Sequence, residues 1–347
     1  MAVQAPPSTV VGAPLKRVEG REKVTGAARY AYEQHPDGVA YAAAVQSTIA
    51  RGTIQDLDAS AAQAVPGVLA VLWHATAPRL QPVPDGELAV LQSPRVAYRG
   101  QYVALVVAET PEIARDAERL VRIRYAPDEH DSVLRADHPG LYRPEKINPS
   151  FPTDTGQGDL EAGLRDAAVT VDATYSTPAL HNNPMEPHAS VAAWEDGDLT
   201  CWDSTQGAPA HRATLAQVFG LEPDRVRVIS PHVGGGFGAK GSPRPQVVLA
   251  AMAAKVVERP VKLAVTRQQM WAVVGYRTPT IQRLQLGADA EGRLTAIAHD
   301  VVEQTSTVRE FAEQTALATR MMYAAPNRRT THRLAALDVP TPSWMRA

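Results

Sequence analysis

The residues best suited to ligand binding lie in the run from Gly234 to Gly241, where three consecutive glycines precede Phe237. Glycines remove every Cβ from a turn, so backbone N–H groups can approach a flat or anionic ligand closely. Burying a phenylalanine side chain contributes about 1.5–3 kcal/mol of favourable free energy. On such a bare loop this contribution is lost unless a ligand or partner covers the ring. The run therefore predicts a ligand-binding turn, with a tight turn under a packed Phe237 as the plain alternative.

Two nucleotide-binding motifs share letters with this run. Gly236, Gly238 and Gly241 have the spacing of the dinucleotide fingerprint, but that motif requires a helix to begin at the glycines, and Pro243 and Pro245 place the helix later. A phosphate-binding P-loop also needs Gly-Lys-Ser/Thr, which does not occur here. A nicotinamide-dependent dehydrogenase consequently stays a minor alternative.

Other residues of the chain have the types that bind metals or react as nucleophiles. His181, Glu186 and His188 offer imidazole and carboxylate groups, but Pro184 and Pro187 exclude a helical metal-ligand pair. Metal ligation by these side chains is therefore disfavoured. The single cysteine excludes internal disulfides and an iron–sulfur cluster held by this chain alone, and we interpret it as a buried structural thiol: Cys201.

The elements that must position the glycine run can be read from the apolar pattern. The alternation over 226–229 predicts a strand before it, and the apolar stretch 246–257 predicts a helix after it. Upstream, 190–194 and 199–202 flank Asp196-Gly197, a strong hairpin signal that brings Gln206 to a strand end. An amide side chain there can donate a hydrogen bond to a ligand oxygen.

Composition limits the class of protein. With 347 residues, 44% apolar and 21% charged, the chain can form two domains with cores of their own. A formal charge of −2 favours neither nucleic acid nor an acidic membrane as partner. No secretory signal is visible and the longest apolar run is too short for a membrane span, so we expect a cytoplasmic location. A partner subunit with an export signal would make it periplasmic.

Several segments, in order along almost the whole chain, resemble one family. They are Gly234–Lys240, Ser204–Gln206, Gly275–Pro279, Arg21–Tyr30 and Val96–Gln101. Through them the chain resembles the molybdopterin-binding large subunit of the xanthine dehydrogenase and aldehyde oxidase family. The resemblance implies a mixed α/β (α+β) fold. It implies an N-terminal arm over 1–20, an α/β hammerhead-like domain over 21–130, a linker over 131–163, and the N-terminal half of a molybdopterin-binding domain over 164–347.

The resemblance also assigns candidate site residues. It implies that Gln206 donates to an oxo group of the cofactor and that the glycine run lies against the cofactor, with Arg346 near the pterin. The cofactor-binding candidates are thus Gln206, Gly235, Gly236, Phe237, Gly238 and Arg346. Arg277 and Phe237 are the substrate-binding candidates, and Glu186 is expected to be a structural carboxylate near the substrate funnel. No side chain is expected to ligate the metal.

The same resemblance implies the chemistry and the partners. The cofactor is molybdenum–molybdopterin, in some members the cytosine dinucleotide form, and electrons leave through [2Fe-2S] and FAD on partner subunits. Gly241 stands where purine-oxidising members have a glutamate, so aldehydes or other N-heterocycles are the expected substrates. The family's late Gly-x-Gly-Glu motif, with its base glutamate, is not in these residues. We therefore expect a catalytically incomplete amino-terminal half that needs a separate C-terminal half, or alternatively an inactive or partner-binding fragment.

Overall fold

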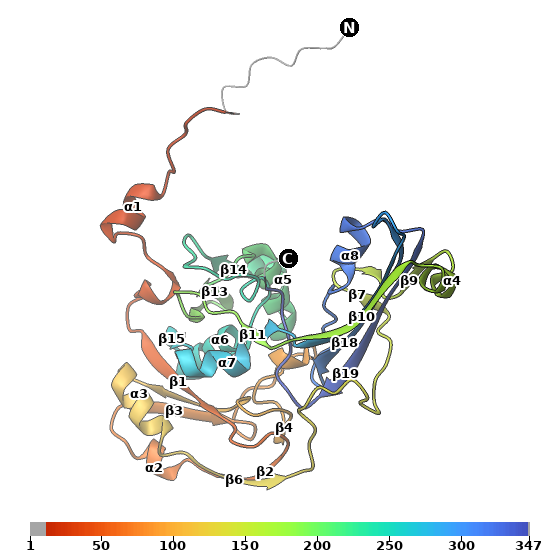
Figure 1. The fold of residues 1–347 in the computed structure, drawn as a ribbon. Coiled ribbons are helices and arrows are strands. Elements are labelled where there is room, and N and C mark those ends of the chain that lie inside the picture. Colours follow the sequence, from red (N-terminus) through yellow and green to blue (C-terminus); the bar gives the residue numbers. More distant parts are fainter. Residues whose placement is uncertain (1–11, 346–347) are drawn as a thin grey trace.

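The computed structural model describes residues 12–345 and contains two main β-sheets that lie side by side (Figure 1). The larger sheet has seven strands. In spatial order they are β14 (Val226–Ile229), β13 (Asp198–Asp203), β12 (Ala189–Glu195), β15 (Val261–Ala264), β1 (Ala40–Gln46), β5 (Tyr102–Ala108) and β3 (Val68–Trp73). The strands from both halves of the chain therefore form one continuous sheet.

The join lies between β15 and β1, which pair in parallel with Val261 opposite Ala40. The sequence predicted separate domains with a boundary in the linker over 131–163. The hydrogen-bonded join shows that the predicted N-terminal module and the later strands share a sheet, although their chain segments are far apart. The predicted mixed α/β class is confirmed.

Helices cover both faces of this sheet. On one face lies α6 (Pro245–Val257), which is apolar on all sides and packs against β12 and β15. Pro245 occupies the first turn of α6, where its missing N–H costs nothing. On the other face α3 (Pro111–Glu118) packs on β1 and β5, with the Thr110 hydroxyl capping its first turn. Because β5 is covered on both faces, all its residues are buried.

The second sheet has five strands, all antiparallel to their neighbours except the parallel pair β18–β19. In spatial order they are β10 (Val169–Thr177), β17 (Thr280–Ala288), β18 (Leu294–Ser306), β19 (Asn327–Leu337) and β9 (Thr155–Gln157). The predicted linker is thus partly folded, since β9 and the helix α4 (Leu160–Arg165) lie within or next to 131–163 and belong to this sheet and its cover.

Smaller elements complete the fold. A three-stranded sheet contains β4 (Arg95–Val96), β2 (Gly52–Asp58) and β6 (Arg122–Pro127), and short pairs join β11 (Leu180–His181) to β16 (Tyr276–Arg277) and β7 (Lys146–Ile147) to β8 (Phe151–Pro152). The other helices are α1 (Gly20–Thr25), α2 (Ser60–Gln63), α5 (Ala208–Phe219), α7 (Arg267–Val273) and α8 (Leu317–Met322), with single 3₁₀ turns at Ala31–Glu33, Gly86–Leu88 and Pro223–Arg225. Among residues 12–345 no helix is long and apolar enough to cross a bilayer.

Candidate functional site

The glycine loop, defined here as Gly234–Gly241, connects β14 to α6 as the sequence predicted. Its backbone enters the left-handed region at Gly235 (φ 93°), Phe237 (φ 56°) and Gly238 (φ 105°). For the bulky Phe237 that conformation costs roughly 1–2 kcal/mol, and 39% of its surface remains exposed. Strain at an exposed aromatic residue favours a site that presents Phe237 to a ligand over a turn that merely packs it.

Three of the loop's glycines lie too close to other residues for an added Cβ, the first being Gly234, whose Cβ would lie 2.5 Å from Glu186 Cβ. A Cβ on Gly236 would lie 2.3 Å from Gln206 Oε1, and a Cβ on Gly238 would lie 2.4 Å from the backbone oxygen of Trp344. All three distances are far inside van der Waals contact. The loop can therefore lie against Gln206 and the C-terminal residues only because it is bare there.

Gln206 follows β13 and is fixed to the loop at two points. Its backbone N–H donates to the Lys240 carbonyl at 2.8 Å, and its side-chain Oε1 accepts from the Gly238 N–H at 3.1 Å. The second bond identifies the oxygen of the amide, so the NH₂ group is the free end. That NH₂ group has no acceptor within residues 12–345 and the side chain is exposed. Gln206 thus offers two N–H donors beside the glycine loop.

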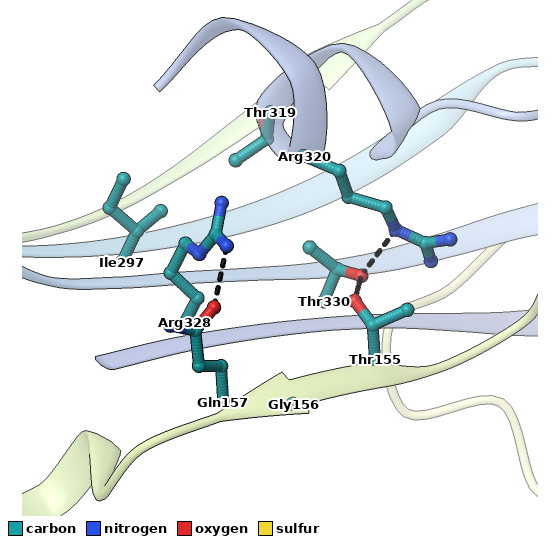
Figure 2. Close-up of a pocket in the computed structure, with 8 residues that line it drawn as sticks. All are labelled: Thr155, Gly156, Gln157, Ile297, Thr319, Arg320, Arg328 and Thr330. Carbon is teal, nitrogen blue, oxygen red and sulfur yellow. Dashed lines mark hydrogen bonds between the residues drawn. The ribbon is translucent and has the colours of Figure 1, made fainter. Parts of the chain in front are cut away.

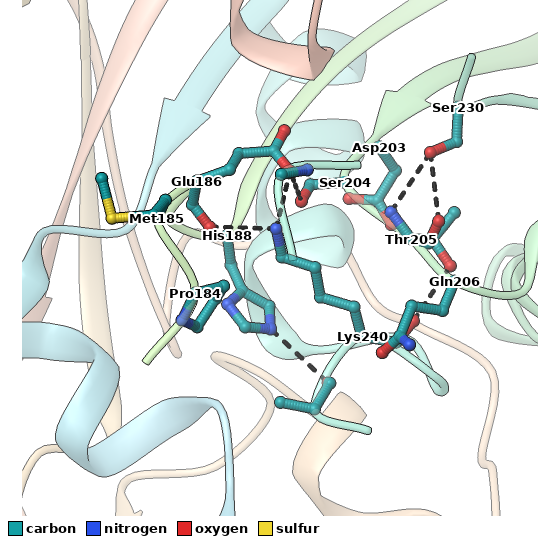
Figure 3. Close-up of polar contacts among 12 residues, drawn as sticks. Pro184, Met185, Glu186, His188, Asp203, Ser204, Thr205, Gln206, Ser230 and Lys240 are labelled. Atoms are coloured by element: carbon teal, nitrogen blue, oxygen red, sulfur yellow. Dashed lines mark hydrogen bonds and ion pairs between the residues drawn. The ribbon is translucent and has the colours of Figure 1, made fainter. Parts of the chain in front are cut away.

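A buried ion pair anchors the loop at Lys240 (Figure 3). Lys240 Nζ lies 2.7 Å from Glu186 Oε2 and 3.0 Å from the Glu186 carbonyl. The same carboxylate oxygen accepts from Ser204 Oγ at 3.0 Å and from Gly234 N–H at 2.8 Å. Burial lowers the pKa of Lys240, and the hydrogen bond to Glu186 opposes that shift. One oxygen of Glu186 thus accepts three hydrogen bonds, and a structural role for this carboxylate stays a prediction.

The sequence did not reveal Arg244, which fixes the other end of the loop. This fully buried side chain donates to the Ala239 carbonyl at 3.1 Å, to Glu87 at 3.2 Å and to Ser343 Oγ at 2.7 Å. Burial lowers the pKa of Arg244 and raises that of Glu87. Three distant segments therefore meet at one guanidinium, and no local pattern in the sequence could have identified it.

Asn182 is a second contact that the sequence analysis missed. Its Nδ2 donates to the carbonyls of Phe237 and Trp344, at 3.0 and 3.1 Å, and so joins the loop to the C-terminal residues. Its Oδ1 is buried without a partner within the described residues, as is Glu186 Oε1. Buried acceptors are normally satisfied. Two buried acceptors without a partner at one loop fit a site that binds the N–H groups of a ligand or ordered water.

The neighbouring histidines do not form a metal centre. His188 lies against the Ala239 carbonyl, and burial lowers its pKa well below the ordinary value, which keeps it neutral. His181 packs edge-on against Trp271 and also contacts the ring of Tyr276. Within residues 12–345 no group of three His, Cys, Asp or Glu side chains could hold a metal ion. Cys201 is buried, and burial raises the pKa of its thiol.

Arg277 contacts the C-terminal residues at the position next to the one that approaches the loop. Its Nη2 donates to the Met345 carbonyl, next to the Trp344 carbonyl that approaches Gly238. Arg277 also lines a cavity of about 440 Å³ together with Glu313, whose pKa is raised by burial. The structure thus brings Gln206, Gly235, Gly236, Phe237 and Gly238 together and connects Arg277 to them through residues 344–345. Arg346 lies outside the described residues.

The loop geometry also weighs against the dinucleotide motif. The helix α6 begins at Pro245, four residues beyond Gly241, so the glycines do not form its first turn. The N-terminus of α6 therefore cannot receive a pyrophosphate at the glycines, as that motif requires.

Comparison with known proteins gives matches along nearly the whole chain. Residues 142–347 match the family model of the molybdopterin cofactor-binding domain, and residues 25–129 match that of the aldehyde oxidase and xanthine dehydrogenase a/b hammerhead domain. The molybdenum-binding subunit PaoC of an aldehyde oxidoreductase from Escherichia coli K12 is 40% identical over 341 residues, covering 97% of this chain and 46% of PaoC. A probable xanthine dehydrogenase subunit from Bacillus subtilis is 33% identical over 82% of this chain and 38% of its own length.

Solved structures agree with this assignment of the fold. The aldehyde oxidoreductase from Desulfovibrio gigas superimposes with a TM-score of 0.78 at 26% identity, covering 95% of this chain and 39% of that one. The CO dehydrogenase from Oligotropha carboxidovorans superimposes with a TM-score of 0.81 at 23% identity, covering 95% and 45% of the two chains, and shows the fold alone. The chain spans less than half the length of each of these four relatives.

Proposed function

The chain belongs to the molybdopterin-binding subunits of the xanthine dehydrogenase and aldehyde oxidase family, and from this premise we propose that it acts in a molybdenum hydroxylase. The proposed reaction is oxidation of an aldehyde or an N-heterocycle with oxygen from water. The observation that carries the proposal is the contact between Gln206 and the bare backbone at Gly236 and Gly238. The exposed Gln206 amide and the bare loop form a cradle with two N–H donors from Gln206 and almost no side-chain bulk.

The residues present fit a pterin-bound metal. The close contacts at Gly236 and Gly238 leave no room for side chains, and the NH₂ group of the exposed Gln206 side chain has no acceptor within residues 12–345. The unsatisfied oxygens of Asn182 and Glu186 add buried acceptors nearby. When bound, a molybdenum–molybdopterin cofactor supplies two-electron oxidation of a substrate carbon. The chain's own part is to hold that cofactor by hydrogen bonds rather than by metal ligation.

In this proposal Gln206 would help to hold the cofactor by donating a hydrogen bond to it from its NH₂ group. The loop backbone is already held by hydrogen bonds from the Gly234 N–H to Glu186 and from the Gly238 N–H to Gln206, so it requires no rearrangement when the ligand binds. Phe237 packs on a flat substrate, which would offset the strain of its backbone. Arg277 donates to a carbonyl or anionic oxygen of the substrate from the cavity that it lines with Glu313.

The substrate class and the electron path follow from two further residues. Gly241 carries no carboxylate to orient a purine, and this supports aldehydes or other heterocycles as substrates. Cys201 is the single cysteine of the sequence and is buried, so this chain cannot ligate an iron–sulfur cluster alone. We therefore propose that electrons pass to an iron–sulfur subunit and an FAD subunit, in a cytoplasmic assembly unless a partner directs export.

The test is to purify the chain with the subunits that accompany it and to measure molybdenum content, released pterin and aldehyde turnover. Acid hydrolysis that releases CMP would identify the cytosine dinucleotide form of the cofactor. Molybdenum bound in proportion to the chain, lost on Gly238→Ala substitution, supports the proposal. An assembly that forms with its partners but contains neither molybdenum nor pterin would instead identify a partner-binding fragment.

A further inference from the structure

A second cavity, of about 250 Å³, lies on the five-stranded sheet and shares no residue with the glycine loop (Figure 2). It lies between the helix α8 and the strands β9, β18 and β19. The residues that line it are Thr155, Gly156, Gln157, Ile297, Thr319, Arg320, Arg328 and Thr330. Its two charged side chains are both arginines.

Arg320 comes from α8 and is fixed before any ligand arrives. Its Nε donates to Thr330 Oγ1 at 2.8 Å, while Nη1 and Nη2 donate to the carbonyls of Pro152 and Thr153, each at 2.8 Å. These bonds use three of the five N–H donors of the guanidinium. Two donors remain on a group whose orientation is already fixed, so binding an acceptor costs little side-chain entropy.

Arg328 comes from β19 and reaches the same space from the sheet (Figure 2). Its Nη2 donates to Gln157 Oε1 at 2.6 Å, and its Nη1 approaches the Tyr323 carbonyl at 3.4 Å. At most two of its five donors are used in this way. The hydroxyl of Thr155, 2.8 Å from Thr330 Oγ1, lies at the same wall of the cavity.

The charge of the cavity is not balanced. No carboxylate lines it, and neither arginine forms an ion pair with any residue of 12–345. Asp154, the carboxylate that acts on Arg320, lies 3.0 Å from Arg333 and 3.4 Å from Arg143. Burial lowers the pKa of Arg320, the response of a cation that has lost water without gaining a close anion.

We propose that this cavity binds a small oxyanion, a phosphate or a carboxylate group. Guanidinium groups suit such ligands because their planar N–H pairs match two oxygens at once. The volume is below the range of about 300–1,000 Å³ typical of pockets for drug-sized ligands. The cavity therefore fits phosphate, pyrophosphate or a short dicarboxylate rather than a dinucleotide. It is a site separate from the proposed cofactor cradle and does not depend on the proposed function.

The test is titration calorimetry on the purified protein with inorganic phosphate and, separately, with succinate, in a buffer free of other oxyanions. We expect binding of at least one of them, weakened about tenfold or more by Arg328→Gln and less by Arg328→Lys. The matched control is Arg212→Gln, an exposed arginine of α5 with no ion pair within residues 12–345, which should leave the affinity unchanged. The tighter ligand of the two identifies the anion class.

A second measurement needs no variant. Phenylglyoxal modifies accessible arginines, and peptide mass spectrometry locates the modified ones. Phosphate or succinate should slow modification of Arg328 and leave that of Arg212 unaffected. The proposal would be overturned if neither anion gave a heat of binding or protected Arg328 from phenylglyoxal. It would also be overturned if the Arg328→Gln variant bound the anions as tightly as the unsubstituted protein.

Discussion

Lys240 Nζ lies 2.7 Å from Glu186 Oε2 in an ion pair that leaves the lysine side chain no accessible surface and the glutamate side chain 12%. Replacing Lys240 by Met keeps the length of the side chain but removes the charge and the two hydrogen bonds that it makes to Glu186. Because a buried carboxylate then lacks its cation, we expect a loss of about 3–5 kcal/mol in the free energy of unfolding. Urea denaturation followed by far-UV circular dichroism measures it.

The matched control for this prediction is Arg283→Gln, which breaks the ion pair between Arg283 of β17 and Asp172 of β10. Both side chains there are about half exposed, so solvent already screens the pair and stability should hardly change. Equal losses for Lys240→Met and Arg283→Gln would show that burial does not determine the contribution of the Lys240 pair.

Gln206→Ala tests the amide beside the glycine loop. The bond from the Gly238 N–H to Gln206 Oε1 lies at an exposed position, so its loss should cost little stability. If the amide donates to the cofactor as proposed, turnover should fall about a hundredfold, the effect typical of removing one preorganised donor. The measurement is kcat of the assembled enzyme, normalised to bound molybdenum, with the exposed Gln217→Ala as control. Unchanged kcat in Gln206→Ala would exclude this role.

Gly238→Ala tests the close approach of the loop to the C-terminal residues. The new Cβ would meet the backbone oxygen of Trp344 at 2.4 Å, and the position has φ 105°. Gly292→Ala is the control, because Gly292 also has positive φ, 81°, but nothing within 4 Å of an added Cβ. Both variants carry backbone strain of roughly 1–2 kcal/mol. Only Gly238→Ala should lose more stability than this strain accounts for, and only it should release bound molybdenum. Thermal unfolding measures the stability, and metal analysis measures the molybdenum.

Glu303 should make stability depend on pH in an unusual direction. Burial raises the pKa of this carboxyl to about 8 from 4.5, although its hydrogen bond with Thr315 opposes the shift. Between pH 4.5 and about 8 the folded chain keeps a proton that the unfolded chain has lost. The contribution of Glu303 to stability is therefore complete below pH 4.5 and decreases as the pH rises above it. That contribution falls by roughly 1 kcal/mol per pH unit as the pH rises towards 8.

Glu303→Gln stays neutral and should remove this slope, while the nearby Glu313 still titrates. The measurement is urea denaturation of both proteins at several pH values between 5 and 8. The stability of the unsubstituted protein relative to Glu303→Gln should decrease steadily across that range. A difference that is constant with pH would contradict a raised pKa for Glu303.

Local patterns were enough to predict the elements that flank the site. The apolar run at 246–257 and the hairpin at Asp196-Gly197 correspond to α6 and to the turn between β12 and β13. Glycines next to an exposed Phe237 indicated the loop itself. These features depend on neighbours in the sequence, so propensity and periodicity can identify them.

The residues that the sequence did not reveal are those that act over long distances along the chain. Asn182 contacts Phe237 and Trp344, and Arg244 contacts Glu87 and Ser343. Neither residue has a distinctive local pattern, because the contacts that define its role come from segments that are distant in the sequence. The strand β9 in the predicted linker was missed for the same reason, because three residues give no period to detect.

The pairing of β1 with β15 has a consequence for how the molecule denatures. Separation of the hammerhead part from the cofactor-binding part would break the bonds around Ala40 and Val261 and open two sheet edges to water. Heating should therefore produce a single calorimetric transition for both parts. A hammerhead fragment made alone would aggregate through the exposed β1 edge.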